Sequence, residues 1–128
     1  MYATNATASH VMASSARDVI TFRERVAIGA TGAASQGAAI GKSPGYDTAF
    51  TCTRASAGTY SLVFPIGKRA WINVALLSAA STVVTWVLTA LDAAAGTATL
   101  VTLAGTNAAA ATDPASGDAL LITIDVER

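Results

Sequence analysis

The residues that could do chemistry are few and lie far apart in the sequence. The only histidine, His10, falls in an irregular N-terminal stretch, whereas a Ser-His-Asp arrangement needs a base that packing holds rigidly. The only cysteine, Cys52, has no second cysteine for an internal disulfide or a metal site. Its position between Thr51 and Thr53 indicates a buried residue that faces inward beside Phe50. The sequence therefore predicts no catalytic residues.

Candidate ligands for metals and phosphates are also sparse. Asp113 and Asp118 flank a Pro-Gly-containing segment that fits either a turn or a calcium loop, and we favour the turn because Asp before Pro commonly initiates one. The string GKS at 41–43 lacks the earlier glycine of a phosphate-binding loop and runs into Pro44. We expect no metal, no cofactor and no small-molecule substrate.

Charge and hydropathy exclude several classes of partner. Hydrophobic residues make up 52% of the 128 residues and charged residues 12%, with a formal net charge of +0. Eight basic residues against eight acidic ones leave no basic footprint for nucleic acid. No apolar run reaches the length of a membrane helix, and the N-terminus lacks the features of a secretory signal. A surface so poor in charge predicts that other protein subunits cover much of it.

Alternating apolar and polar residues predict a succession of β-strands. Residues 1–17, rich in Ala, Thr and Ser, are expected to form an extended arm. Residues 18–29 alternate, and Glu24 is the one exception on their apolar side, expected near a strand end or an interface beside an arginine. Residues 29–47 hold five glycines and predict a long loop, with a short strand around Ala38–Ile40. The strands expected after this loop are Thr48–Ala55, Thr59–Ile66, Trp71–Ala79, Thr82–Leu91, Thr97–Ala104 and Asp118–Glu127.

Short strands at regular spacing are typical of a β-sandwich or barrel. We predict an all-β, antiparallel β-sandwich over residues 18–128, with seven or eight strands in two sheets, preceded by the arm. Residues 83–88 are apolar on both faces, so that strand is expected to be central or to have its outer face covered by a partner. The expected core residues are Phe50, Cys52, Leu62, Phe64, Leu120, Ile122 and Ile124.

Three segments together resemble parts of tailed-bacteriophage virion proteins. TRASAGTYSLVFP (53–65) is similar to a strand, glycine turn and strand found there. TVVTWVLTALDAAAGTATLVTLAG (82–105) is similar to their hairpin, and ATDPASGDALLITIDVER (111–128) to their closing loop and strand. The resemblance covers residues 48–128 and implies a jelly-roll-like β-sandwich, often trimeric, of the kind found in capsid decoration (cement) proteins, head fibres and tail or fibre modules.

The resemblance leads us to expect a capsid decoration protein that bridges capsomers on the outside of the shell. It would be made in the bacterial cytoplasm and reside on the virion, with the major capsid protein and copies of itself, as a homotrimer, for partners. Two alternatives stay open: a tail, baseplate or fibre module with a connector or host-recognition role, and a cellular binding module or enzyme. The candidate capsid or subunit contacts are Tyr2, Val11, Met12, Arg17, Arg23, Arg25, Lys42 and Tyr46. The candidate trimer interface comprises Trp71, Val84, Trp86 and Leu88.

Overall fold

The computed structural model of the chain describes residues 19–36, 41–42, 50–77, 83–104 and 107–128. The predicted arm and the predicted short strand around Ala38–Ile40 lie outside these residues. The described residues form ten β-strands and one 3-10 turn, η1 (Ala30–Gly32). No helix in this part of the chain is long and apolar enough to cross a membrane.

One sheet, sheet A, contains the first and the last long strands side by side. Its order is β2 (Ala34–Gln36), β1 (Val19–Ile28), β10 (Ala119–Glu127) and β6 (Arg69–Leu77), and β3 (Gly41–Lys42) also pairs with β1. All of these pairings are antiparallel. The ladder between β10 and β6 is regular over its whole length, so β6 forms one uninterrupted edge of sheet A.

The second sheet, sheet B, is built from two hairpins. Its order is β4 (Thr51–Ser56), β5 (Thr59–Val63), β8 (Thr97–Ala104) and β7 (Val83–Asp92), and β9 (Asn107–Ala111) pairs with the end of β8. β7 therefore lies at an edge, which contradicts a central position for residues 83–88; a partner covering its outer face stays a prediction. The β7–β8 register shifts twice, so β7 is bulged.

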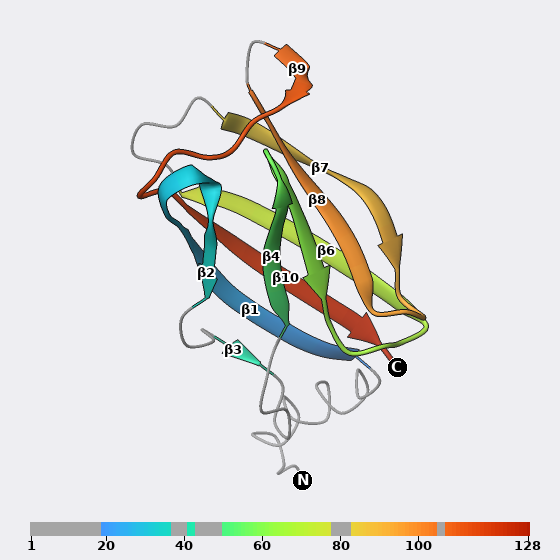
Figure 1. Cartoon of the computed structure of the whole chain (residues 1–128). Helices are drawn as coiled ribbons and strands as arrows, with labels where there is room; N and C mark the ends of the chain where they lie inside the picture. The colour runs from blue at the N-terminus through green and yellow to red at the C-terminus, as the bar shows by residue number, and fades with distance from the viewer. Residues whose placement is uncertain (1–18, 37–40, 43–49, 78–82, 105–106) are drawn as a thin grey trace, which may run out of the picture.

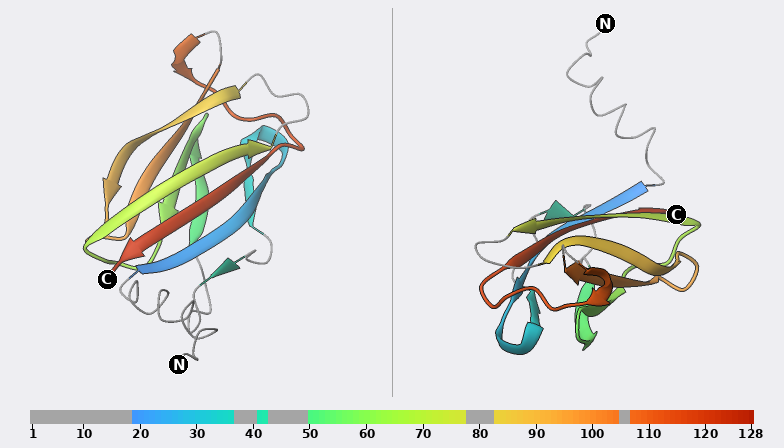
Figure 2. Two further views of the ribbon diagram at one scale, coloured as in Figure 1. Left: turned by 180° about the vertical axis from the view of Figure 1, so that it is seen from behind. Right: turned by 90° about the horizontal axis from the view of Figure 1, so that it is seen from above.

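The two sheets face each other and enclose a single apolar core, as Figure 1 and the view from above in Figure 2 show. Strict alternation along the long strands sends every second side chain inward, and in β1 these include Phe22 and Val26, neither of which has exposed surface. The predicted all-β sandwich is confirmed. The seven predicted core residues are all buried, with exposed fractions of 6% or less.

The differences from the predicted strands have local causes. β5 ends at Val63 instead of Ile66, because Pro65 carries no backbone N–H to continue a ladder. β6 begins at Arg69, two residues earlier than expected, because β10 pairs with it as far as Glu127. The short strands β2, β3 and β9 were not predicted, since each is small-residue-rich and held by its neighbour rather than by its own alternation.

Candidate functional site

A glutamine joins the two sheets where the edge strands β2 and β4 approach each other. Nε2 of Gln36 donates to the carbonyl oxygen of Phe50 at 2.8 Å, and its Oε1 accepts from the backbone N–H of Cys52 at 2.6 Å. These two backbone groups flank Thr51 and belong to the edge of β4 that faces away from β5. A neighbouring strand would bind the same two groups, so the side-chain amide closes part of this edge and ties sheet B to sheet A.

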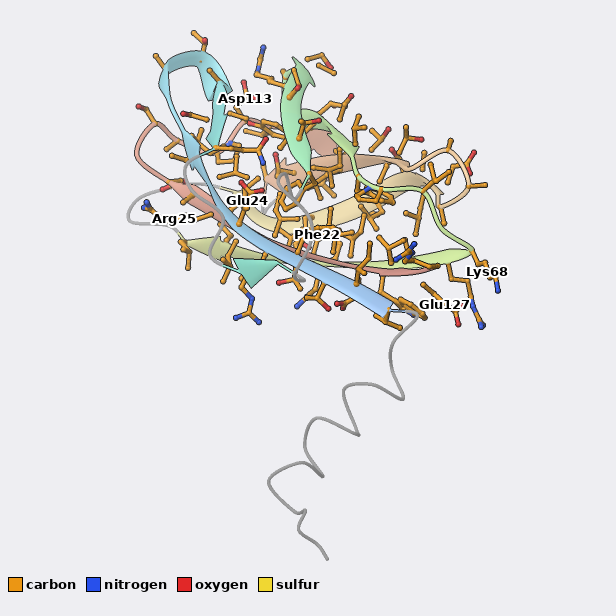
Figure 3. All side chains as sticks on the ribbon, turned by 90° about the horizontal axis from the view of Figure 1, so that it is seen from below. Phe22, Glu24, Arg25, Lys68, Asp113 and Glu127 are labelled. Carbon is orange, nitrogen blue, oxygen red and sulfur yellow. The ribbon has the colours of Figure 1, made fainter. Side chains whose placement is uncertain are left out.

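The buried carboxylate of Glu24 belongs to the same cluster. Glu24, labelled in Figure 3, is 5% exposed and lies in the interior of β1. It accepts a hydrogen bond from Nε2 of Gln36 at 3.1 Å. Glu24 therefore does not lie near a strand end, and its partner is Gln36 on the adjacent strand β2 instead of the expected arginine; the alternative position at an interface stays a prediction.

The inward orientation predicted for Cys52 is confirmed. Burial, and to a lesser degree the charge of Glu24, raises the pKa of the Cys52 thiol to about 12. The thiol is therefore protonated at neutral pH, and its environment is that of a core residue and not of an activated nucleophile.

Asp113 is the centre of a second polar cluster, at one end of the sandwich. Arg54 binds its carboxylate through two hydrogen bonds, of 3.0 Å from Nε and 2.8 Å from the terminal nitrogen. The backbone N–H of Gly58 donates to the same carboxylate at 2.7 Å, and the Tyr60 hydroxyl, which donates to the Gly32 carbonyl at 2.9 Å, lies 3.5 Å away. Asp113 thus connects the turn at Gly32, the β4–β5 hairpin and the loop before β10.

The electrostatics of this cluster indicate a structural role. The hydrogen bonds from Arg54, followed by that from Gly58, lower the pKa of Asp113, whereas burial and then the Asp113 charge raise the pKa of Tyr60. A carboxylate held ionised by an arginine and a tyrosine held neutral are both unsuited to exchange protons near neutral pH. Among the described residues, no group of three or more His, Cys, Asp or Glu side chains is placed to hold a metal ion.

The outer face of sheet A carries a different set of residues. We use this name for the side chains of β1, β10 and β6 that point away from the core; the left panel of Figure 2 looks onto these strands. Trp71 and Leu77 of β6 are 47% and 45% exposed on this face. Arg23 and Arg25 of β1 are also exposed on it, two strands away. The register aligns Arg23 with Asn73 and Arg25 with Ala75 through the intervening strand β10.

Among the residues that the structure describes, the one ion pair on this face lies at one end of the sheet. Nε of Arg69 lies 2.6 Å from Oε1 of Glu127, and this pairing lowers the pKa of Glu127. Asp125 accepts a hydrogen bond of 2.6 Å from the Thr21 hydroxyl. Arg23 and Arg25 form no ion pair with any residue that the structure describes. Arg25 lies at the opposite end of the sheet from Lys68 and Glu127 (Figure 3), so it is well separated from the ion pair of Arg69 with Glu127.

The structure places only some of the predicted capsid, subunit and trimer contact residues on one surface. Arg23, Arg25 and Trp71 share the outer face of sheet A. Trp86 and Leu88 instead point from β7 toward the core and are half-buried against it, so they do not share a face with Trp71. Tyr2, Val11, Met12, Arg17 and Tyr46 lie outside the described residues. Lys42 is described by its strand pairing alone and Val84 by its position in β7 alone.

Sequence reasoning missed three features of these sites. Leu77 lies six residues after Trp71 on the same strand, so alternation alone places both on one face. Arg54 and Asp113 are 59 positions apart in the sequence, so no local sequence pattern predicts that they pair. Gln36 lies in a segment that composition marks as a loop.

The outer face of sheet B provides a contrast. In the central part of this face the exposed side chains are hydroxyl-bearing or β-branched, for example Thr51, Thr53 and Val63, and the described strands place no basic residue there. Among the described residues, the exposed tryptophan Trp71 and the exposed arginines Arg23 and Arg25 therefore share the outer face of sheet A, which we take as the candidate functional site. The chain has no significant match among the protein-family models, curated proteins and solved structures with which it was compared.

Proposed function

We propose that the chain is a structural protein of a tailed-bacteriophage particle that docks onto the outside of the capsid through the outer face of sheet A. The observation that carries this proposal is that Trp71, Leu77 and two arginines without an ion pair among the described residues share one face of one sheet. Aromatic and arginine side chains are the types most enriched in protein interfaces. The resemblance of residues 48–128 to virion proteins supplies the kind of partner.

The arrangement suits adhesion more than catalysis. Trp71 and Leu77 offer apolar area on one side of the face, and Arg23 and Arg25 offer cationic groups on the other. A partner surface with an apolar strip beside acidic residues would match this pattern. Burial of apolar area contributes about 25 cal/mol per Å² before the cost of association is subtracted. Repetition of one modest contact over many capsomers then stabilises the shell at its seams.

The test is binding of the purified chain to shells of the encoding phage that lack it. The double variant Arg23→Ser, Arg25→Ser should bind at least about tenfold more weakly, because the acidic partner groups lose their counter-charges. The control is Lys68→Ser, Arg128→Ser, which removes the same number of exposed charges at the other end of sheet A and should leave binding unchanged. An equal loss of binding in both variants would mean that net charge alone determines binding, and it would contradict a specific docking face.

The position of the chain on the particle separates the decoration role from its alternative. Antibodies against the chain, applied to purified virions and imaged by electron microscopy, should label the head. Label confined to the tail, baseplate or fibres would instead support a connector or host-recognition module. An absence of label, with the chain also missing from the virion's protein content, would overturn both.

A further inference from the structure

The edges of the two sheets are protected to very different degrees. The outer side of β1 is paired with β2 and β3, and the edge of β4 is partly closed by the amide of Gln36. β7 is interrupted by two register shifts, which blunt an edge against strand addition. β6 has none of these protections: its ladder with β10 is regular, and no described residue pairs with its other side. Its eight residues 70–77, AWINVALL, carry no charge.

The register shows which backbone groups β6 turns to this open edge. In an antiparallel ladder, successive residues direct their N–H and C=O groups to opposite sides. The N–H of Ile28 donates to the Asp118 carbonyl at 2.9 Å, so even-numbered residues of β10 face β1 and odd-numbered ones face β6. Leu121 pairs with Ala75, so the odd-numbered residues of β6 bond to β10. The open edge therefore presents the backbone groups of the even-numbered residues 70, 72, 74 and 76.

The side chains of β6 are symmetrical about Val74. On the outer face the order is large, small, small, large: Trp71, Asn73, Ala75 and Leu77. On the inner face, Ile72 and Leu76 lie at equal distances from Val74 in sequence. A strand with this pattern is complementary to an antiparallel copy of itself, because large residues then oppose large ones and small oppose small.

We infer that two copies of this chain associate through β6, edge to edge and antiparallel, around a twofold axis at Val74. Trp71 of each copy then lies opposite Leu77 of the other, and Asn73 lies opposite Ala75. The even-numbered residues form the hydrogen-bonded pairs, so the free backbone groups on both edges are satisfied by about six hydrogen bonds. Sheet A becomes continuous across the two copies, and the two exposed large hydrophobic side chains of β6 gain partners.

This inference does not rest on the proposed docking function, although it would double the docking face. It replaces the predicted trimer contact with a twofold one. The binding partner is a second copy and not a foreign peptide, because the symmetry of the side-chain pattern about Val74 is a property that only self-pairing uses.

Sedimentation velocity over the micromolar range gives the first test. The wild-type chain should sediment as a dimer, and Trp71→Lys should raise the dissociation constant at least about tenfold, because a charge at a sheet edge opposes strand pairing. Thr53→Lys, which places the same charge on the outer face of sheet B, should leave the dimer intact. A wild-type chain that stays monomeric at every concentration, or equal dissociation by both variants, would overturn the inference.

Disulfide trapping tests the register and does not depend on affinity. Residues 73 and 75 of opposite copies form a non-hydrogen-bonded pair with Cα atoms about 4.5 Å apart, which a disulfide can bridge. An oxidised mixture of the Asn73→Cys and Ala75→Cys variants should yield a cross-linked dimer, whereas each variant alone should not. Cross-linking of the Asn73→Cys variant with itself, or none in the mixture, would contradict the twofold pairing at Val74.

Discussion

Replacing Gly32 by alanine should test how much the contacts of Asp113 with the neighbouring turn and hairpin stabilise the fold. Gly32 has a φ of +75°, in the left-handed region that favours glycine. A Cβ atom built there would lie 2.3 Å from Cγ of Asp113 and 2.5 Å and 2.7 Å from its two carboxylate oxygens. The substitution Gly32→Ala therefore both strains the backbone and displaces a carboxylate that three other groups contact.

The magnitude follows from these two effects. A non-glycine residue at positive φ costs about 1–2 kcal/mol. Displacement of the carboxylate leaves the N–H of Gly58 without its acceptor, and an unsatisfied buried donor costs about 1–3 kcal/mol. The free energy of unfolding should therefore fall by about 3 kcal/mol, which for a domain of this size lowers Tm by about 10 °C.

Urea unfolding followed by circular dichroism measures the effect. Gly117→Ala is the matched control, because Gly117 also has a positive φ, of +96°, yet a Cβ there meets nothing within 4 Å. The control should therefore lose only the free energy that the backbone strain costs, about 1–2 kcal/mol. In an Asp113→Ala background, Gly32→Ala should cost no more than this control. Equal costs for Gly32→Ala and Gly117→Ala in the wild-type background would refute the assigned contact with Asp113.

Three further predictions concern the polar clusters. Hydrogen bonds from Arg54 lower the pKa of Asp113, so the ionised carboxylate stabilises the folded state fully at pH values above its ordinary pKa of 3.8. This stabilisation is lost as the pH falls through the lowered pKa of the folded state. Asp113→Asn should therefore flatten the pH dependence of the urea midpoint below about pH 5. Gln36→Ala should lower the free energy of unfolding by about 2–3 kcal/mol in urea titrations, because two backbone groups of β4 and a buried carboxylate lose their partner. Cys52, buried and with its pKa raised to about 12, should react with a thiol reagent in denaturant and not in the folded protein; rapid reaction of the folded chain would contradict its placement in the core.

The sequence predicted the fold well where alternation is strong. β1, β8 and β10 lie within one or two residues of their predicted bounds, because each alternates over eight or more positions and buries every second side chain. The seven expected core residues follow from the same periodicity. Alternation assigns the face of a side chain, but it does not say which strands are neighbours. The edge position of β7 therefore emerges only from the assembled sheet.

The polar clusters could not be predicted for a related reason. Arg54 meets Asp113, and Gln36 meets Glu24, only because separate loops and strands converge in space. An arginine was expected beside Glu24 because opposite charges commonly pair, but a neutral amide on β2 occupies that place. The candidate docking face was partly predictable: Arg23, Arg25 and Trp71 were singled out by type, and their common face became evident when β10 placed β1 beside β6.

The proposed function predicts which surface of the chain contacts the capsid in the assembled particle. Cryo-electron microscopy of virions that carry the chain, at a resolution that separates strands, would show which surface contacts the shell. The account predicts that the outer face of sheet A lies against capsid protein, with Arg23, Arg25 and Trp71 in the contact and the outer face of sheet B turned to solvent. Density showing the outer face of sheet A open to solvent, with the shell contacted elsewhere, would contradict it.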